Sequence, residues 1–467
     1  MATLQHLPAE LLISIFDYLG DTEALWSLCL VSRSLCGIAQ HLLYRDLLFA
    51  PLHTPECSPR RLFLLTRTIV SCPHLAVQVR RINLDAVRDC ELCGGEMEFN
   101  IYDRPNSANP SIDGYSYDDK LYYVPTKLAL FHDKEYGYPD VTALTSLLLS
   151  HLPNLEHLNA VLGHHSVSRL IRMPTEEHHC SLLLSVLRIL NLTSSGKEQM
   201  KISLNDIMPL LSLPRLHEIN LDHVRGCGPT GISEPTSASV PPKRFMFSKI
   251  SFRYSCVDAR SIQALLGACK SLRVFRYRFC ASSVNQFNPS ELRSALNTQM
   301  ESLEHLQVSF YWNMEDKDYA RYWKRATYGS LNKFRKLKSL DLDQAFLDDL
   351  PKLPKSLERF ALQNCYESVF ETMCHLARGV NQGALPLLDE VYLSTDVLSP
   401  GKMLGLPLRG ATDLLFEKSC DTLKSLFTGT SVCVKFETDL LSKIADDYSF
   451  AFEIDRSGIF WPLIYLA

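Results

Sequence analysis

The chain has 467 residues, of which 46% are hydrophobic and 21% are charged, the composition of an ordinary globular protein. A net charge of −4 gives no general electrostatic reason to bind nucleic acid or an anionic membrane surface, so we expect neither partner. Pro8, Glu10 and Asp17 interrupt the apolar start, and no run reaches the length of a membrane span, so no signal peptide or transmembrane segment is expected. The 15 cysteines without a secretory signal favour reduced thiols in the cytoplasm or nucleus.

Three helical patterns open the chain, at residues 7–20, 22–30 and 32–49. Five large apolar residues of the first pattern fall on one broad arc of a helical wheel: Leu11, Leu12, Ile15, Phe16 and Leu19. A unit this small cannot bury so much apolar surface by itself. We therefore expect this arc to lack an internal partner and to pack against another chain.

A six-residue pattern then recurs along the chain, with apolar residues at its first, fourth and sixth positions. The copies end at Leu84, Ala160, Leu192, Leu221, Phe252, Tyr277, Val308, Leu342, Leu362 and Leu393. From Leu192 onward the copies are 20 to 34 residues apart, close to the length of a strand plus a helix. This spacing predicts an α/β fold, a leucine-rich-repeat solenoid in which a curved parallel sheet is covered outside by helices.

In each copy the second and third apolar residues should point inward from a short strand, while the residues between them face outward. Helical stretches such as 261–272 and 290–303 should cover the other side. Cys280 and Cys365 follow the last apolar residue of their copies by three positions, where leucine-rich repeats place Asn or Cys. We interpret both thiols as structural.

Two segments interrupt the repeats. Residues 85–150 form an insertion that is rich in turn formers and holds seven tyrosines, at 102, 115, 117, 122, 123, 136 and 138. Tyrosines favour binding surfaces, but they equally well attach a loop to its own solenoid. Residues 226–243 should be an exposed loop rich in Gly, Ser and Pro. The predicted organisation is a three-helix unit at 1–50, a connecting helix and first repeat at 51–84, the insertion at 85–150, repeats at 151–400 and a capping region at 401–467.

Motifs for other chemistries lack their structural context. GCGPTG at 226–231 has the spacing of a dinucleotide-binding loop, but Pro229 prevents the helix that such a loop must open. Cys90 and Cys93 supply half of a zinc site, which His178, His179 and Cys180 could complete only if the fold brought them together. There is no GxSxG elbow and no HExxH helix. We predict no catalytic residues, no metal and no cofactor.

Residues 7–49 resemble an F-box, whose pattern begins with Leu-Pro, continues with an Ile-Phe pair and reaches Val-Ser-Arg in the third helix. Here Val31, Ser32 and Arg33 supply the last element, and Leu35 stands where many F-boxes have Trp. The chain is similar to F-box proteins with leucine-rich repeats, of a divergent type. The residues that would contact an adaptor by this resemblance are Leu7, Pro8, Leu11, Ile15, Phe16, Leu19, Leu25, Leu28 and Val31.

The resemblance implies a non-catalytic substrate receptor. An F-box binds the Skp-type adaptor of a Skp–cullin–F-box ubiquitin ligase and is linked through it to a cullin, while the repeats recruit a protein substrate. Such a chain accelerates ubiquitin transfer by proximity alone. The outward strand positions that we predict to contact the substrate are Arg253, Arg276, Arg278, Gln307, Asp341, Asp343 and Tyr392.

Other interpretations of the same sequence remain. The three helices could cap their own solenoid, because capping helices also carry apolar faces. An adaptor-bound chain could serve a non-degradative complex. The tyrosine-rich insertion could instead close over a small ligand as in a receptor, and an enzyme with an unrecognised site has the least support.

Overall fold

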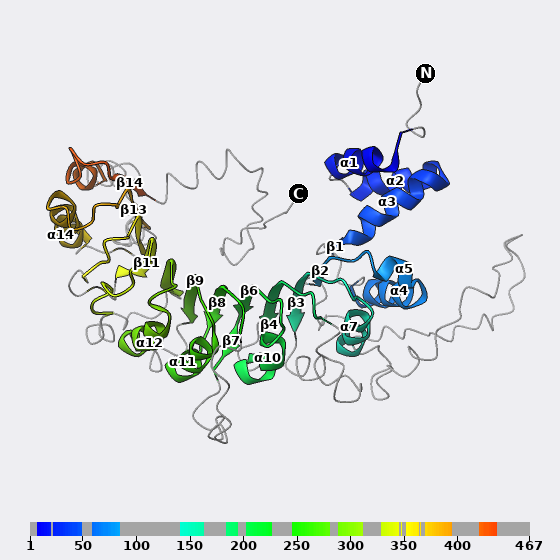
Figure 1. The fold of residues 1–467 in the computed structure, drawn as a ribbon, viewed down its shortest axis with the longest axis horizontal. Helices are drawn as coiled ribbons and strands as arrows, with labels where there is room; N and C mark the ends of the chain where they lie inside the picture. The colour runs from blue at the N-terminus through cyan, green and yellow to red at the C-terminus, as the bar shows by residue number, and fades with distance from the viewer. Residues whose placement is uncertain are drawn as a thin grey trace, which may run out of the picture. The chain divides into compact units, whose positions relative to one another are not determined.

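The computed structural model describes residues 7–19, 22–48, 58–84, 141–162, 184–194, 202–226, 245–280, 288–311, 328–344, 347, 352–363, 365, 369–394 and 420–436. Two compact units divide the chain, Met1–Glu218 and Ile219–Ala467. Each unit contains parallel strands and helices (Figure 1). No helix in these described ranges is both long and apolar enough to cross a bilayer. The predicted insertion through residue 140, the predicted loop after Gly226 and the segment after Phe436 lie outside the described residues.

The first unit begins with three helices, α1 (Ala9–Leu19), α2 (Thr22–Val31) and α3 (Arg33–Arg45). Six buried residues form their common core: Leu12, Phe16, Leu25, Leu35, Ala39 and Leu42. The prediction of a third helix that continues to residue 49 is wrong, because Asp46–Leu48 form strand β1. These residues pair in parallel with β2 (Arg81–Leu84), and that hydrogen bonding replaces the last helical turn.

The other elements of the first unit follow from the same pattern of alternating helix and strand. Helices α4 (Ser58–Ser71), α5 (Pro73–Ala76) and α7 (Val141–Ser150) precede or separate β2, β3 (His157–Leu162) and β4 (Ile189–Ser194). Helix α7 occupies the last ten residues of the predicted insertion and packs beside α4. A short strand β5 (Ile202–Ser203) and helix α10 (Leu204–Leu211) complete the unit.

The second unit repeats the arrangement. Its strands are β6 (Glu218–Asp222, at the boundary), β7 (Val224–Arg225), β8 (Lys249–Ser255), β9 (Val274–Cys280), β10 (His305–Tyr311), β11 (Ser339–Asp343), β12 (Arg359–Gln363), β13 (Glu390–Leu393) and β14 (Cys433–Phe436). From β8 to β14 each strand pairs in parallel with the next strand of the chain. Figure 1 shows α11 (Ala259–Ala268) and α12 (Pro289–Leu296) along one side of the strands β8 and β9.

All ten copies of the sequence pattern coincide with strands of the two units. The second and third apolar residues of every copy are buried, as in Leu190 and Leu192 of β4 or Phe275 and Tyr277 of β9. The predicted inward direction of these side chains is therefore confirmed, and so is an α/β fold with parallel strands. The predicted helices within 261–272 and 290–303 appear as α11 and as α12 followed by a 3-10 turn, Asn297–Gln299.

Gln299, at the end of that turn, links neighbouring repeats inside the core. Its side-chain Nε2 donates to the carbonyl oxygens of Leu266 at 2.8 Å and Cys269 at 3.3 Å. Its Oε1 accepts from the main-chain N–H of Leu272 at 2.9 Å. One buried amide thus pairs three main-chain groups between α11 and β9, groups that would be costly to leave unpaired.

One connection between strands of the second unit is short. Only 20 residues separate Leu342 of β11 from Leu362 of β12, the shortest step between copies. The described residues of this connection, 344, 347 and 352–358, contain no helix, and the next helix is α14 (Val369–Asn381). A step of 20 residues leaves little room for a strand, two turns and an α-helix.

Candidate functional site

Helix α1 presents two different apolar faces. Phe16 is 1% exposed and lies with Leu12 in the core of the three helices. Leu11 and Ile15 are 52% and 40% exposed, and Leu19 one turn further on is also exposed. Spacing of four residues places Leu11, Ile15 and Leu19 in one stripe along the helix. This stripe, called the α1 stripe below, leaves much of its apolar surface exposed.

The nine residues predicted to contact an adaptor therefore fall into three groups. Pro8, Leu11, Ile15, Leu19 and Val31 are exposed, and Leu7 and Leu28 are half-buried. Phe16 and Leu25 are buried. The expectation that the whole apolar arc lacks an internal partner is wrong for Leu12 and Phe16, because α2 and α3 supply one: both residues pack against Leu25, Leu35, Ala39 and Leu42.

Helix α2 adds exposed apolar residues that the sequence analysis did not select. Trp26 and Leu30 lie four residues apart and are both exposed, as is Tyr18 on α1. Their spacing was visible in the sequence, since they follow the buried Leu25 by one and five positions. Exposed large apolar residues on two adjacent short helices are typical of a protein-binding surface.

Polar contacts hold the three helices in place. The hydroxyl of Ser32 caps α3 by accepting from the main-chain N–H of Leu35 at 3.3 Å, which accounts for Ser between Val31 and Arg33. Nη1 of Arg45, the last residue of α3, lies 2.8 Å from Oδ1 of Asp17 on α1. These contacts fix the direction of α1 relative to α3 and so the place of the α1 stripe.

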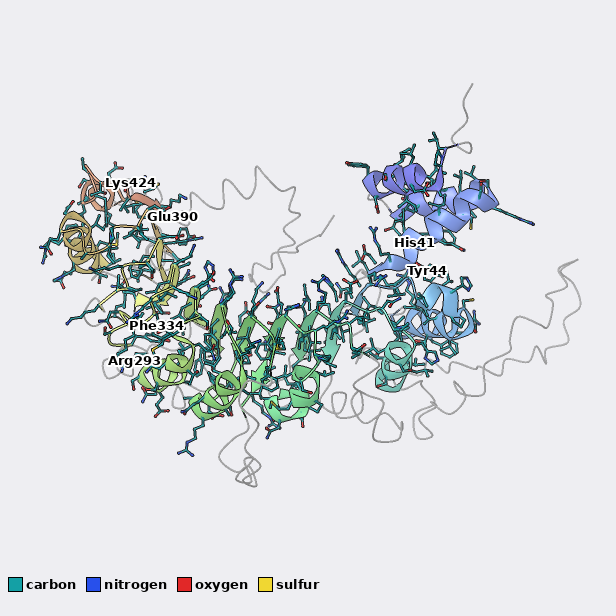
Figure 2. The ribbon with its side chains drawn as sticks, in the orientation of Figure 1. His41, Tyr44, Arg293, Phe334, Glu390 and Lys424 are labelled. Atoms are coloured by element: carbon teal, nitrogen blue, oxygen red, sulfur yellow. The ribbon has the colours of Figure 1, made fainter. Side chains whose placement is uncertain are left out.

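Tyr44 lies in the last turn of α3, the helix of the N-terminal three that contacts α5. Figure 2 shows its side chain and that of His41 on α3, next to the start of β1. Burial raises the pKa of Tyr44, and the nearby thiols Cys72 and Cys29 raise it further. Tyr44 is therefore a neutral packing residue between α3 and the segment that follows α4, not a titrating group.

The described residues show no cofactor or metal centre. Among them, no group of three His, Cys, Asp or Glu side chains is placed to hold an ion. The predicted zinc candidates Cys90, Cys93, His178, His179 and Cys180 lie outside the described residues. The structure therefore leaves those residues untested.

The outward face of the sheet in the second unit carries the basic residues of the predicted substrate surface. Arg253 on β8 and Arg276 on β9 are exposed, and Arg278 and Gln307 are half-buried. The parallel register aligns Arg276 with Gln307 and Gln307 with Asp341 in one row across three strands. Arg253 lies 3.7 Å from Asp222, measured from Nε to Oδ1.

The prediction that all seven substrate positions are exposed is wrong for Asp343 and Tyr392, which are buried. Tyr392 lies opposite the small Ala361 in the register, and its ring is 6.0 Å from the guanidinium carbon of Arg359. A large side chain beside a small one can fold across the sheet and lose its exposure. Asp343 ends β11 where the chain turns inward, since the following Gln344 is also buried.

Asp341 is an unusual member of the same row. Its Oδ1 is buried without a hydrogen-bond partner, while Oδ2 accepts from Nε2 of Gln363 at 3.3 Å. Burial raises the pKa of Asp341 to about 6, although the hydrogen bond from Gln363 and the charge of Arg278 both lower it. Asp341 is therefore a half-buried acid of the outward row, in which Arg276 is exposed.

Comparison with known families concerns the three N-terminal helices, which carry the α1 stripe. The model of the F-box-like family matches residues 4–50, which include α1, α2 and α3. No curated protein matches the chain. The chain therefore carries an F-box-like domain at its N-terminus, and domains of this kind are typically non-catalytic adaptors that bind Skp-type proteins.

Proposed function

We propose that this protein is the substrate-recognition subunit of a Skp–cullin–F-box ubiquitin ligase, acting in the cytoplasm or nucleus. The observation that carries the proposal is the α1 stripe within an F-box-like domain. Leu11 and Ile15 expose apolar surface although Phe16, their neighbour, is fully packed. A Skp-type adaptor is the partner that would cover this surface and connect the chain to a cullin.

The rest of the chain is proposed to be a leucine-rich-repeat solenoid that binds a protein substrate. Ten strands at the predicted positions, parallel and in chain order, support this architecture. The proposed contact surface is the outward face with Arg253, Arg276, Arg278 and Gln307. Asp343 and Tyr392 leave that surface because they are buried, and Asp341 contributes through its charge more than through contact.

In this role the chain does no covalent chemistry. It holds a substrate lysine near the ubiquitin thioester, which a conjugating enzyme carries elsewhere on the cullin scaffold. Tethering raises the effective concentration of the lysine without requiring a nucleophile or base from this chain. The geometry between the two binding surfaces would then determine which lysines are modified.

The proposal is tested by size-exclusion chromatography of the full chain mixed with a Skp-type adaptor, and then with adaptor and cullin together. A stoichiometric complex with the adaptor that also incorporates the cullin is expected. A monodisperse chain that elutes apart from the adaptor would refute the adaptor role. A complex with the adaptor that excludes the cullin would refute the ligase and leave only the adaptor contact.

A further inference from the structure

A groove lies beside the turns that precede β11 and β12 in the second unit. The groove has a volume of about 610 Å³ and lies between the turns that precede these two strands and helix α14. It is walled by Asn332 and Arg335, by residues 352–356, and by His375, Leu376 and Gly379 of α14. The size is that of a site for a small ligand or a few peptide side chains.

Main-chain and side-chain hydrogen bonds hold its walls together. The N–H of Leu331 donates to the carbonyl of Lys352 at 3.0 Å, which ties the two turns to each other. The hydroxyl of Ser356 donates to the carbonyl of Leu337 at 2.8 Å. Phe334, which is labelled in Figure 2, is buried in the core next to Arg335. The groove is therefore preformed, and a ligand would not have to order its walls.

The rim of the groove is cationic. Arg335, Lys352 and Lys355 line it and are exposed, together with His375 from α14. Within the described part of the chain none of the three cations makes an ion pair, although lysines and arginines elsewhere in this unit do, as Arg273 with Glu304. No Asp or Glu is among the residues that line the groove. The complementary ligand carries negative charge.

The floor of the groove is apolar. It is formed by Leu353, Pro354, Leu376 and Leu385, with Ala384 at its edge. A compact inorganic anion is best bound by converging N–H and hydroxyl donors, and an apolar floor offers none. A floor of this kind instead suits a hydrocarbon side chain, while the rim pairs with carboxylates beside it.

We propose that this groove binds an acidic peptide segment of a partner protein, with an apolar side chain of that segment on the floor and its carboxylates at Arg335, Lys352 and Lys355. The segment lies between these two turns and α14. This site is on the helical side of the unit, and it depends neither on the α1 stripe nor on the outward face of the sheet.

Glycines in two helices provide a steric test with a matched control. A Cβ added at Gly379 would meet nothing within 4 Å, and Gly379 lines the groove, so Gly379→Phe places a large side chain where the peptide would lie. Gly267 of α11 is equally open but is not part of the groove. The probe is a fluorescein-labelled dodecapeptide of glutamates around two central leucines, and the measurement is fluorescence anisotropy with the full chain.

We expect saturable binding that Gly379→Phe abolishes and Gly267→Phe leaves unchanged. Lys352→Glu with Lys355→Glu should weaken binding by about tenfold or more, and more steeply at low salt. The same change at Lys333 and Lys336, exposed lysines of the neighbouring turn outside the groove, should have little effect.

Three results would overturn the proposal. The first is no binding of the probe, and the second is binding that Gly379→Phe does not alter. The third is binding of pyrophosphate at the same residues while the leucines of the probe prove dispensable, which would make the groove a phosphate site. A matched peptide with serines in place of the two leucines separates the last case, because only a peptide site should lose affinity for it.

Discussion

Substituting Leu11→Asp and Ile15→Asp together should abolish adaptor binding without unfolding the chain. At 52% and 40% exposure the two side chains offer roughly 150 Å² of apolar surface, worth about 4 kcal/mol at full burial. That free energy corresponds to up to about a thousandfold in Kd. Isothermal titration calorimetry with the Skp-type adaptor measures the loss, and circular dichroism checks that the helices remain.

Two further variants separate binding from folding. Leu64→Asp on α4 changes a residue that is 39% exposed but lies outside the F-box-like domain, so it should not alter the Kd. Phe16→Ala removes a core ring and should cost about 3 to 5 kcal/mol of F-box stability. An unchanged Kd for the Leu11 and Ile15 variant, with Leu64→Asp as reference, would refute the assignment of the α1 stripe to the adaptor.

Three other predictions concern the second unit. Gln299→Leu removes the side-chain partner of the Cys269 carbonyl and of the Leu272 N–H, while the Leu266 carbonyl still accepts from the N–H of Cys269 at 3.1 Å. The substitution should cost about 2 kcal/mol or more, measured by urea unfolding together with faster hydrogen exchange at the N–H of Leu272. The pKa of Asp341 rises from 3.8 in the unfolded chain to about 6 in the folded one, so its stabilising protonated form is lost as the pH rises from about 4 to 6. Asp341→Asn should therefore stabilise the chain relative to the parent by about 3 kcal/mol at pH 7 but not below about pH 4, and equal differences in thermal unfolding at both pH values would contradict this sign. Burial raises the pKa of Cys269 to about 12, so native protein treated with iodoacetamide near neutral pH should be alkylated at the exposed Cys433 and not at Cys269, as peptide mass mapping can show.

The strands could be predicted from the sequence because each copy of the pattern has the same physical cause. Three apolar residues must be buried in every repeat, and Leu190 and Leu192 or Leu340 and Leu342 satisfy that need in the same way. The end of α3 could not be predicted so well. Residues 46–48 read equally well as a helix or a strand, and the choice depends on pairing with β2, far along the chain.

The site was harder to predict than the fold because burial of one side chain depends on its neighbours. Ile15 and Phe16 are adjacent and both apolar, and only the position of α2 and α3 decides that Phe16 faces inward. Tyr392 is at an outward position by its register, opposite the small Ala361, yet it is buried. The groove was not predicted from the sequence, because its lining comes from two turns and from α14, which only the fold brings together.

Helix α3 continues directly into strand β1, which fixes the orientation of the three N-terminal helices relative to that strand. Arg45 ends the helix and Asp46 begins the strand, with no linker between them, and Arg45 also contacts Asp17 of α1 and Oδ2 of Asp46 at 3.3 Å. A helix turns by about 100° and advances by about 1.5 Å for each residue. One residue inserted after Leu42 would therefore swing the α1 stripe around the axis of α3 while hardly lengthening the chain. The orientation of a partner bound to α1, relative to the strands of the first unit, therefore depends on the number of residues in α3. A single insertion in this helix would change that orientation more than a longer loop elsewhere would.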